Sequence, residues 1–112
     1  MEKDNKFGFE NLDVWQRSID MANVVYNLTK SFPSDERFGI VSQMRRAAVS
    51  VSSNIAEGSS RWSRNEQARF FEIAYGSLME LISEAKIAED QNFISTLDYK
   101  ALRDQVSEIC QV

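Results

Sequence analysis

The 112-residue sequence contains no histidine, one cysteine, one proline and four glycines. Without histidine, the chain lacks the commonest general base and the commonest protein ligand of metal ions. The single thiol, Cys110, cannot form a disulfide within one chain, which fits a reducing cytoplasm. So few glycines and prolines disfavour a β-sandwich or a barrel, which need many tight turns. We therefore expect a cytoplasmic protein that is not an enzyme, with no catalytic residues, no cofactor and no metal.

Long apolar runs are also missing. No stretch of about 18 apolar residues is free of charge, and the segment Met1–Lys6 is itself charged. These features exclude a membrane span and a secretory signal, so no membrane partner is expected. Hydrophobic residues make up 43% and charged residues 27% of the chain, which is typical of one globular domain.

Apolar residues recur at steps of three and four along most of the chain, which is the period of an α-helix. The pattern predicts four helices, at about residues 12–32, 34–57, 63–90 and 95–112. Residues 1–10 show no such period and are predicted to form a flexible arm, so that residues 11–112 make one domain. Short connections between long helices favour an all-α, antiparallel up-down-up-down four-helix bundle.

Capping signals set the expected helix boundaries. Pro33 should end the first helix, because proline disfavours helical geometry in the residue before it. Ser34 is a suitable N-cap for the second helix, and Gly58 suits the left-handed position just past its end. The third and fourth helices each start with a serine followed three residues later by an acidic residue, a capping-box pattern: Ser63 with Glu66, and Ser95 with Asp98.

Small residues are concentrated in the second helix, over Ala47–Ser53. Serine and valine are mediocre helix formers, so packing must favour them here. The third helix carries a matching small segment, Ala74–Ser77, in which Gly76 costs about 1 kcal/mol relative to alanine. We expect the two helices to cross closely at Gly76, so that Gly76→Leu would destabilise the fold by overpacking.

A polar row runs beside the apolar row of the second helix, through Arg46, Ser50, Asn54 and Glu57 to Arg61. It has two interpretations: a hydrogen-bonded network at a helix or subunit boundary, with Glu57 and Arg61 as an i,i+4 pair, or an ordinary exposed face. The candidate structural network also includes a residue of the third helix and comprises Arg46, Ser50, Asn54, Glu57 and Glu80.

Glu80 and Glu84 lie one turn apart on the third predicted helix. A carboxylate-bridged metal site in a bundle needs several converging glutamates and usually a histidine, so none is expected here. Instead, we expect Glu80 to face an arginine such as Arg45 or Arg46.

Charge is unevenly distributed in a chain whose net charge is −4. Residues 37–69 carry a net charge of +4, whereas residues 1–36 carry −3 and residues 70–112 carry −5. An acidic chain is a poor general binder of nucleic acid, because phosphate neutralisation supplies most of that affinity. Cations and an aromatic nevertheless gather about one helix end as a candidate patch for an anionic partner: Arg61, Trp62, Arg64 and Arg69.

Several segments together resemble the bacterial four-helix-bundle proteins encoded in ribosomal RNA intervening sequences. They are LDVWQR at 12–17, FPSDE at 32–36, QMRRAAVSVSSNIAEG at 43–58 and AYGSLMEL at 74–81. The resemblance implies a closed bundle that assembles into a ring-like homopentamer without catalytic activity. It also implies kinship with the accessory proteins of diversity-generating retroelements, in which a basic surface binds nucleic acid.

Two hypotheses of function follow. The first is a non-enzymatic homo-oligomeric scaffold, a pentamer by the resemblance, because the first helix carries more apolar faces than one small core can cover. The second is an accessory protein that binds nucleic acid through the arginine patch. Neither hypothesis requires a small-molecule substrate.

Overall fold

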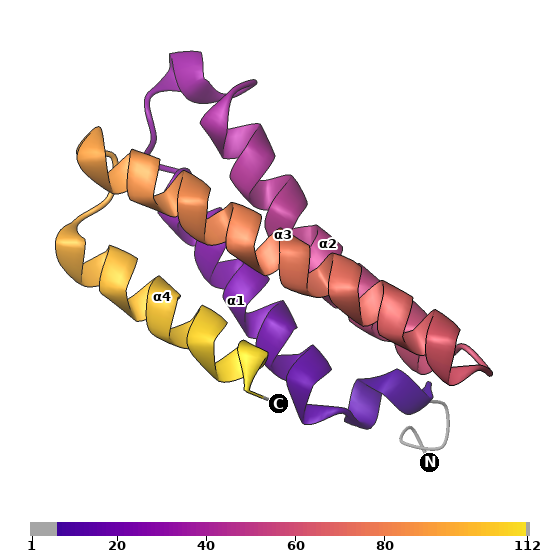
Figure 1. Ribbon diagram of the computed structural model, residues 1–112. Helices are drawn as coiled ribbons and strands as arrows, with labels where there is room; N and C mark the ends of the chain where they lie inside the picture. Colours follow the sequence, from indigo (N-terminus) through magenta and orange to yellow (C-terminus); the bar gives the residue numbers. More distant parts are fainter. Residues whose placement is uncertain (1–6, 112) are drawn as a thin grey trace.

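Four α-helices build the computed structural model, which describes residues 7–111. They are α1 (Asp13–Thr29), α2 (Ile40–Ser59), α3 (Arg64–Asp90) and α4 (Thr96–Cys110), and the described residues contain no strand. Successive helices run in alternating directions (Figure 1). The predicted all-α, up-down-up-down bundle is therefore confirmed.

The hairpin of α2 and α3 is longer than the pair formed by α1 and α4. Figure 1 shows its turn extending beyond the end of α4, with the short 3-10 helix Gly8–Asn11 nearby. Because α4 ends early along the hairpin, part of α3 near the turn is left without a helix above it. Phe71 and Tyr75 of α3 are accordingly exposed.

The core lies among all four helices. Each helix contributes one fully buried large side chain to its centre: Met21, Met44, Leu81 and Leu102. Burying a side chain of this kind stabilises the fold by about 1.5–3 kcal/mol. Smaller side chains, such as Ala47, Ala48, Val51 and Ala74, fill the space where α2 and α3 approach each other.

The ends of the first two helices differ from the prediction. α1 ends at Thr29 rather than at residue 32, and α2 begins at Ile40 rather than at Ser34. Between them Phe32 is buried against Phe93, with ring centroids 5.4 Å apart. Because Phe32 points into this contact, the chain departs from the axis of α1 before Pro33. Ser34–Glu36 then forms a short 3-10 helix instead of the first turn of α2.

The two helical glycines have environments opposite to those predicted. Gly58 lies inside α2, which ends at Ser59, so it is not a left-handed residue past the end. A Cβ added at Gly58 would be 2.8 Å from Cε1 of Phe71 and 3.0 Å from Cβ of Phe70. A Cβ added at Gly76 would have nothing within 4 Å. The expected crossing at Gly76 is therefore wrong, and the position that requires glycine is Gly58.

The two serine caps are confirmed. The hydroxyl of Ser63 accepts a hydrogen bond from the backbone N–H of Glu66 at 3.1 Å. The hydroxyl of Ser95 accepts one from the N–H of Asp98 at 3.0 Å. The fourth helix was predicted to extend to residue 112, and α4 ends at Cys110. Residue 112 itself lies outside the described residues.

The predicted flexible arm is only partly covered, because residues 1–6 lie outside the described part of the chain. Its remaining residues are ordered by contacts with α1. The ring of Phe9 packs edge-on against Trp15, with centroids 5.1 Å apart, and the side chain of Gln16 donates a hydrogen bond to the backbone carbonyl of Glu10 at 2.8 Å. Residues 8–10 thus belong to a short 3-10 helix that lies against α1, while the flexibility of the arm stays a prediction.

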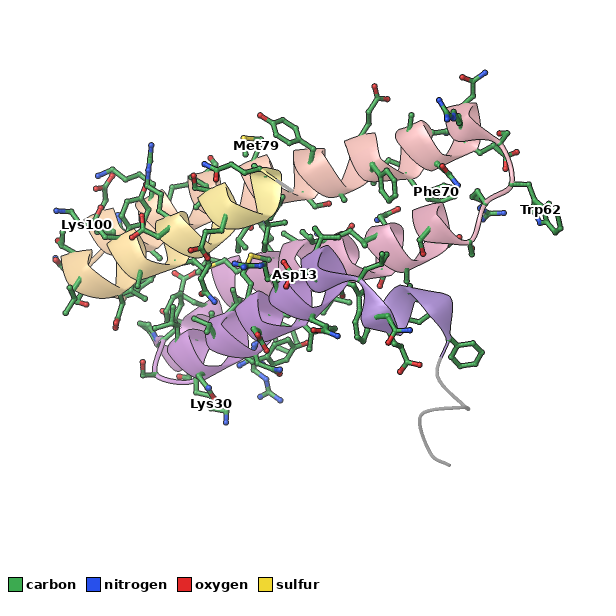
Figure 2. All side chains as sticks on the ribbon, turned by 90° about the horizontal axis from the view of Figure 1, so that it is seen from below. Asp13, Lys30, Trp62, Phe70, Met79 and Lys100 are labelled. Carbon is green, nitrogen blue, oxygen red and sulfur yellow. The ribbon has the colours of Figure 1, made fainter. Side chains whose placement is uncertain are left out.

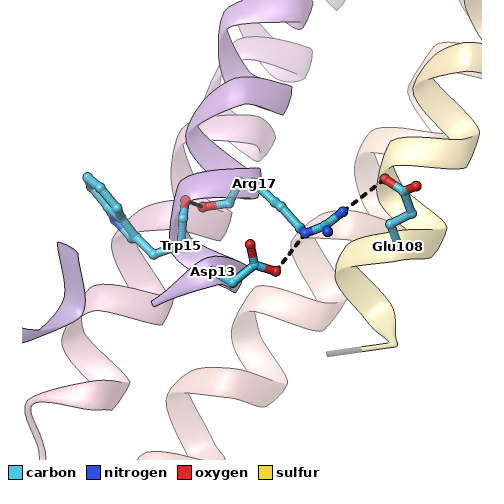
Figure 3. A network of polar contacts seen from close by, with 5 residues as sticks. Asp13, Trp15, Arg17 and Glu108 are labelled. Carbon is cyan, nitrogen blue, oxygen red and sulfur yellow. Dashed lines mark hydrogen bonds and ion pairs between the residues drawn. The ribbon is translucent and has the colours of Figure 1, made fainter. Parts of the chain in front are cut away.

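The start of α1 is tied to the end of α4 by Arg17 (Figure 3). Its Nε donates to Asp13 at 2.7 Å and its Nη1 to Glu108 at 3.2 Å. All three side chains are substantially exposed, so these ion pairs contribute little stability. They link the first turn of α1 to the last turns of α4.

Candidate functional site

A polar seam joins α2 to α3 on the outer side of the hairpin. The hydroxyl of Ser77 donates to that of Ser50 at 2.9 Å, and the amide of Asn54 donates to the same Ser50 oxygen at 3.0 Å and to its backbone carbonyl at 2.8 Å. Ser50 and Asn54 belong to the predicted network, whereas Ser77 belongs to the small segment of the third helix that is predicted to pack on the second. Because these side chains are small, the two helices can approach closely, and their polar groups still find hydrogen-bond partners in each other.

Glu84 is a buried carboxyl group beside this seam that sequence reasoning did not single out as part of the network. Its side chain is only 7% exposed, and its Oε1 accepts no hydrogen bond from any described residue. Burial is the largest cause that raises the pKa of Glu84, the charge of Glu80 and a hydrogen bond with it act in the same direction, and the charge of Arg46 opposes them, so that the pKa is about 7. The group therefore titrates near neutral pH. Its spacing of four from Glu80 was the only sequence signal.

The remaining network candidates have other partners. Glu80 hydrogen-bonds to Glu84, and the charge of Arg46 lowers the pKa of Glu84. Glu57 pairs instead with Arg61, with 2.8 Å between Oε2 and Nη2, as their i,i+4 spacing predicts. Of the two arginines expected to face Glu80, Arg45 turns toward α1 instead. Its Nε donates to the hydroxyl of Thr29 at 2.9 Å.

The arginine patch surrounds the turn between α2 and α3. Trp62 is fully exposed and projects from that turn (Figure 2). The guanidinium of Arg61 lies over the ring of Phe70, 4.6 Å from its centroid, and is also held by its ion pair with Glu57. Arg64 and Arg69 are exposed on the first turns of α3. The patch thus combines one arginine that is paired with a glutamate, two exposed arginines and an exposed tryptophan ring.

An apolar cavity of about 210 Å³ lies where α4 ends. Its wall includes the exposed aromatics Phe71 and Tyr75 and, at the rim, Cys110. Burial raises the pKa of the Cys110 thiol, which keeps it protonated and poorly nucleophilic. Enzyme pockets combine apolar walls with a few convergent polar groups, and this wall supplies chiefly apolar contact.

Within residues 7–111, no group of three or more acidic or cysteine side chains converges as a metal-ion site would require. None of the helices in this range combines the length and the apolar character needed to cross a membrane.

The chain is similar to a known protein family and to a solved structure. The family model for 23S rRNA-intervening sequence proteins matches residues 10–112. The fold is similar to a crystal structure of a protein of unknown function from the S23 ribosomal protein family of Bacteroides thetaiotaomicron, with a TM-score of 0.77 and 20% identity. That likeness covers 86% of this chain and 90% of the other. No curated protein matches the chain.

Proposed function

The chain belongs to the 23S rRNA-intervening sequence protein family, and from that premise we propose that it is a non-enzymatic scaffold that assembles into a homo-oligomer. The proposed number of copies is five, the number that the family resemblance implies. The polar groups that converge on the α2–α3 seam, two hydroxyls and an amide, hydrogen-bond to each other and hold helices together. Because these polar groups bond to one another within the fold, we assign them a structural role.

The observation that carries this proposal is a set of exposed apolar side chains on the solvent side of α3. Ile73, Met79 and Ile87 are between 41% and 52% exposed, although they belong to a helix that already buries a full apolar row. Figure 2 shows Met79 at the outer edge of the bundle. Isolated exposed apolar residues are normal, but a repeated set along one helix is typical of a protein contact.

Size-exclusion chromatography with light scattering tests the proposal. At micromolar concentration we expect a particle of about five times the 12.9 kDa subunit mass. Replacing Ile73 and Met79 together by serine should shift it toward one subunit mass. Leu97→Ser serves as the matched control, because Leu97 is equally apolar and more exposed but lies on α4. A wild-type particle of one subunit mass throughout would contradict the proposal.

A second candidate function is binding of nucleic acid at the arginine patch. The full exposure of Trp62 between Arg61 and Arg64 favours it, because an open aromatic ring can stack on a base while the arginines neutralise phosphates. Binding of a fluorescent single strand should then fall steeply with salt and weaken in Trp62→Ala, but not in Lys100→Ala on α4. Absence of binding at low salt would rule it out.

A further inference from the structure

A shallow groove lies between the end of α1 and the start of α2. Its volume is about 470 Å³, within the range of about 300–1,000 Å³ that is typical of small-molecule sites. Among the described residues, no acidic side chain lines it. Figure 2 shows Lys30, one turn beyond Tyr26, at the end of the bundle away from Trp62. We call it the arginine groove and define it by these lining residues: Tyr26, Arg37, Phe38, Ser42, Arg45 and Arg46.

The guanidinium group of Arg45 is held in place inside the groove. Its Nε donates a hydrogen bond to the hydroxyl of Thr29 at 2.9 Å, and its Cζ lies 4.5 Å from the centroid of the Tyr26 ring. The Thr29 hydroxyl is itself fixed, because it donates to the backbone carbonyl of Val25 at 2.8 Å. An arginine whose side chain is already ordered loses little conformational entropy when it binds an anion. Arg45 is therefore preorganised as a donor to an anionic ligand.

Further donors line the same groove. Arg37 is exposed, and neither it nor Arg45 forms an ion pair with a residue in the range 7–111. Ser42 is exposed one turn before Arg46 and adds a hydroxyl. The charge of Arg46 also acts on Glu84, whose pKa it lowers, so Arg46 is the weaker donor. Two guanidinium groups and a hydroxyl are suited to the oxygens of phosphate groups.

An aromatic ring stands beside these donors. Phe38 is 88% exposed, and the Cζ of its neighbour Arg37 lies 5.4 Å from the centroid of its ring. Such a ring offers a planar apolar surface on which a nucleobase can stack. The groove thus combines the two kinds of contact that a nucleotide makes, one to its phosphates and one to its base.

We propose that the arginine groove binds a free nucleotide of the nucleoside diphosphate class, with the phosphates on Arg37 and Arg45 and the base on Phe38. A simple anion would leave the ring of Phe38 without a contact. A nucleic acid strand is disfavoured, because the chain has a net charge of −4 and its field opposes a long polyanion. A small ligand contacts the groove alone. The proposal does not depend on the oligomeric state.

Isothermal titration calorimetry with ADP and with pyrophosphate, at low salt, tests the proposal. Arg45→Met keeps an apolar side chain of similar length beside Tyr26 but removes the charge. We expect it to weaken the binding of both ligands by about tenfold. Phe38→Ala removes the stacking surface, so it should weaken ADP by about tenfold and leave pyrophosphate unchanged. The difference between the two variants separates recognition of the phosphates from recognition of the base.

Matched controls come from α4. Arg103 is an exposed arginine whose Nη1 donates to the hydroxyl of Tyr99 at 3.2 Å, so Arg103→Met removes a comparable charge beside a tyrosine. Leu97 is 78% exposed, and Leu97→Ala removes a comparable exposed apolar side chain. Both variants should bind ADP as the wild type does. Circular dichroism verifies the fold of every variant.

Four outcomes would overturn the proposal. The wild type fails to bind ADP at low salt, or Arg45→Met and Phe38→Ala bind it as the wild type does. Pyrophosphate binds the wild type as tightly as ADP, which would show that the base is not recognised. A single-stranded oligonucleotide binds more tightly than ADP and loses affinity in the same two variants, which would make the groove a nucleic-acid site. Loss of ADP binding in Trp62→Ala instead of Phe38→Ala would place the nucleotide at the arginine patch and equally contradict the proposal.

Discussion

The inner and outer sides of the α2–α3 hairpin use small residues in opposite ways. On the inner side, Gly58 leaves room for Phe70 and Phe71, and a Cβ there would be too close to both. On the outer side, Gly76 faces open space between exposed apolar residues of α3. The same residue type thus marks a closed contact within the chain and an open surface on its outside. We interpret the open surface as one that a second copy covers.

The largest expected effect is that of closing the space at Gly58. Gly58→Leu must displace Phe70 and Phe71, and we expect it to lower the free energy of unfolding by about 3 kcal/mol. Gly76→Leu is the matched control and should cost less than about 0.5 kcal/mol, because nothing lies within 4 Å of its Cβ position. Urea denaturation at low protein concentration measures both. If both variants lose the same free energy of unfolding, Gly58 and Gly76 do not differ in packing, and the comparison of the inner and outer sides of the hairpin is wrong.

A smaller effect is expected at Glu84, where the hairpin buries a titratable group. Its raised pKa means that the folded state holds the proton more tightly than the unfolded state. Stability should therefore fall as pH rises from about 4.5 to about 7, and stay lower above that range. Glu84→Gln removes the charge and should be more stable than wild type at pH 8 by about 2 kcal/mol.

Thermal denaturation between pH 4 and pH 8 checks this prediction. Glu72→Gln is the control, because Glu72 is an exposed carboxylate on the same helix. If Glu84→Gln and the wild type show the same dependence on pH, the burial of Glu84 does not perturb its proton affinity.

The smallest effect is expected for Gly76→Ala. An exposed helical position gains propensity when glycine becomes alanine, so the free energy of unfolding should rise by about 0.5–1 kcal/mol. Chemical denaturation measures this change, again at a concentration too low for assembly. A loss of stability would show that α3 is crowded at Gly76 after all.

The sequence was informative where local signals act alone. Helical periodicity predicted the four helices and most of the buried positions, and the serine caps predicted the starts of α3 and α4. Predictions from the sequence were wrong where a contact between residues far apart in the chain determines a helix end or the room for a side chain. The burial of Phe32 against Phe93 shortens α1, and the packing of Phe71 decides which glycine is essential. Neither contact leaves a local signal in the sequence.

The candidate site shows the same division. The row containing Ser50 and Asn54 was visible in the sequence as a polar pattern, but the partner hydroxyl of Ser77 comes from another helix. The contact between Arg45 and Tyr26 leaves no sequence signal, because the two residues are far apart in the chain. Their contact, and the exposure of Phe38 beside it, requires the packing of α1 against α2.

Chemical cross-linking between copies tests the proposed assembly most directly. With a lysine-reactive cross-linker at micromolar protein concentration, we expect the wild type to form a ladder of covalent oligomers on a denaturing gel, ending at about five subunit masses. The variant that combines Ile73→Ser with Met79→Ser should stay mostly at one subunit mass. A wild type that remains at one subunit mass under the same conditions would contradict the account.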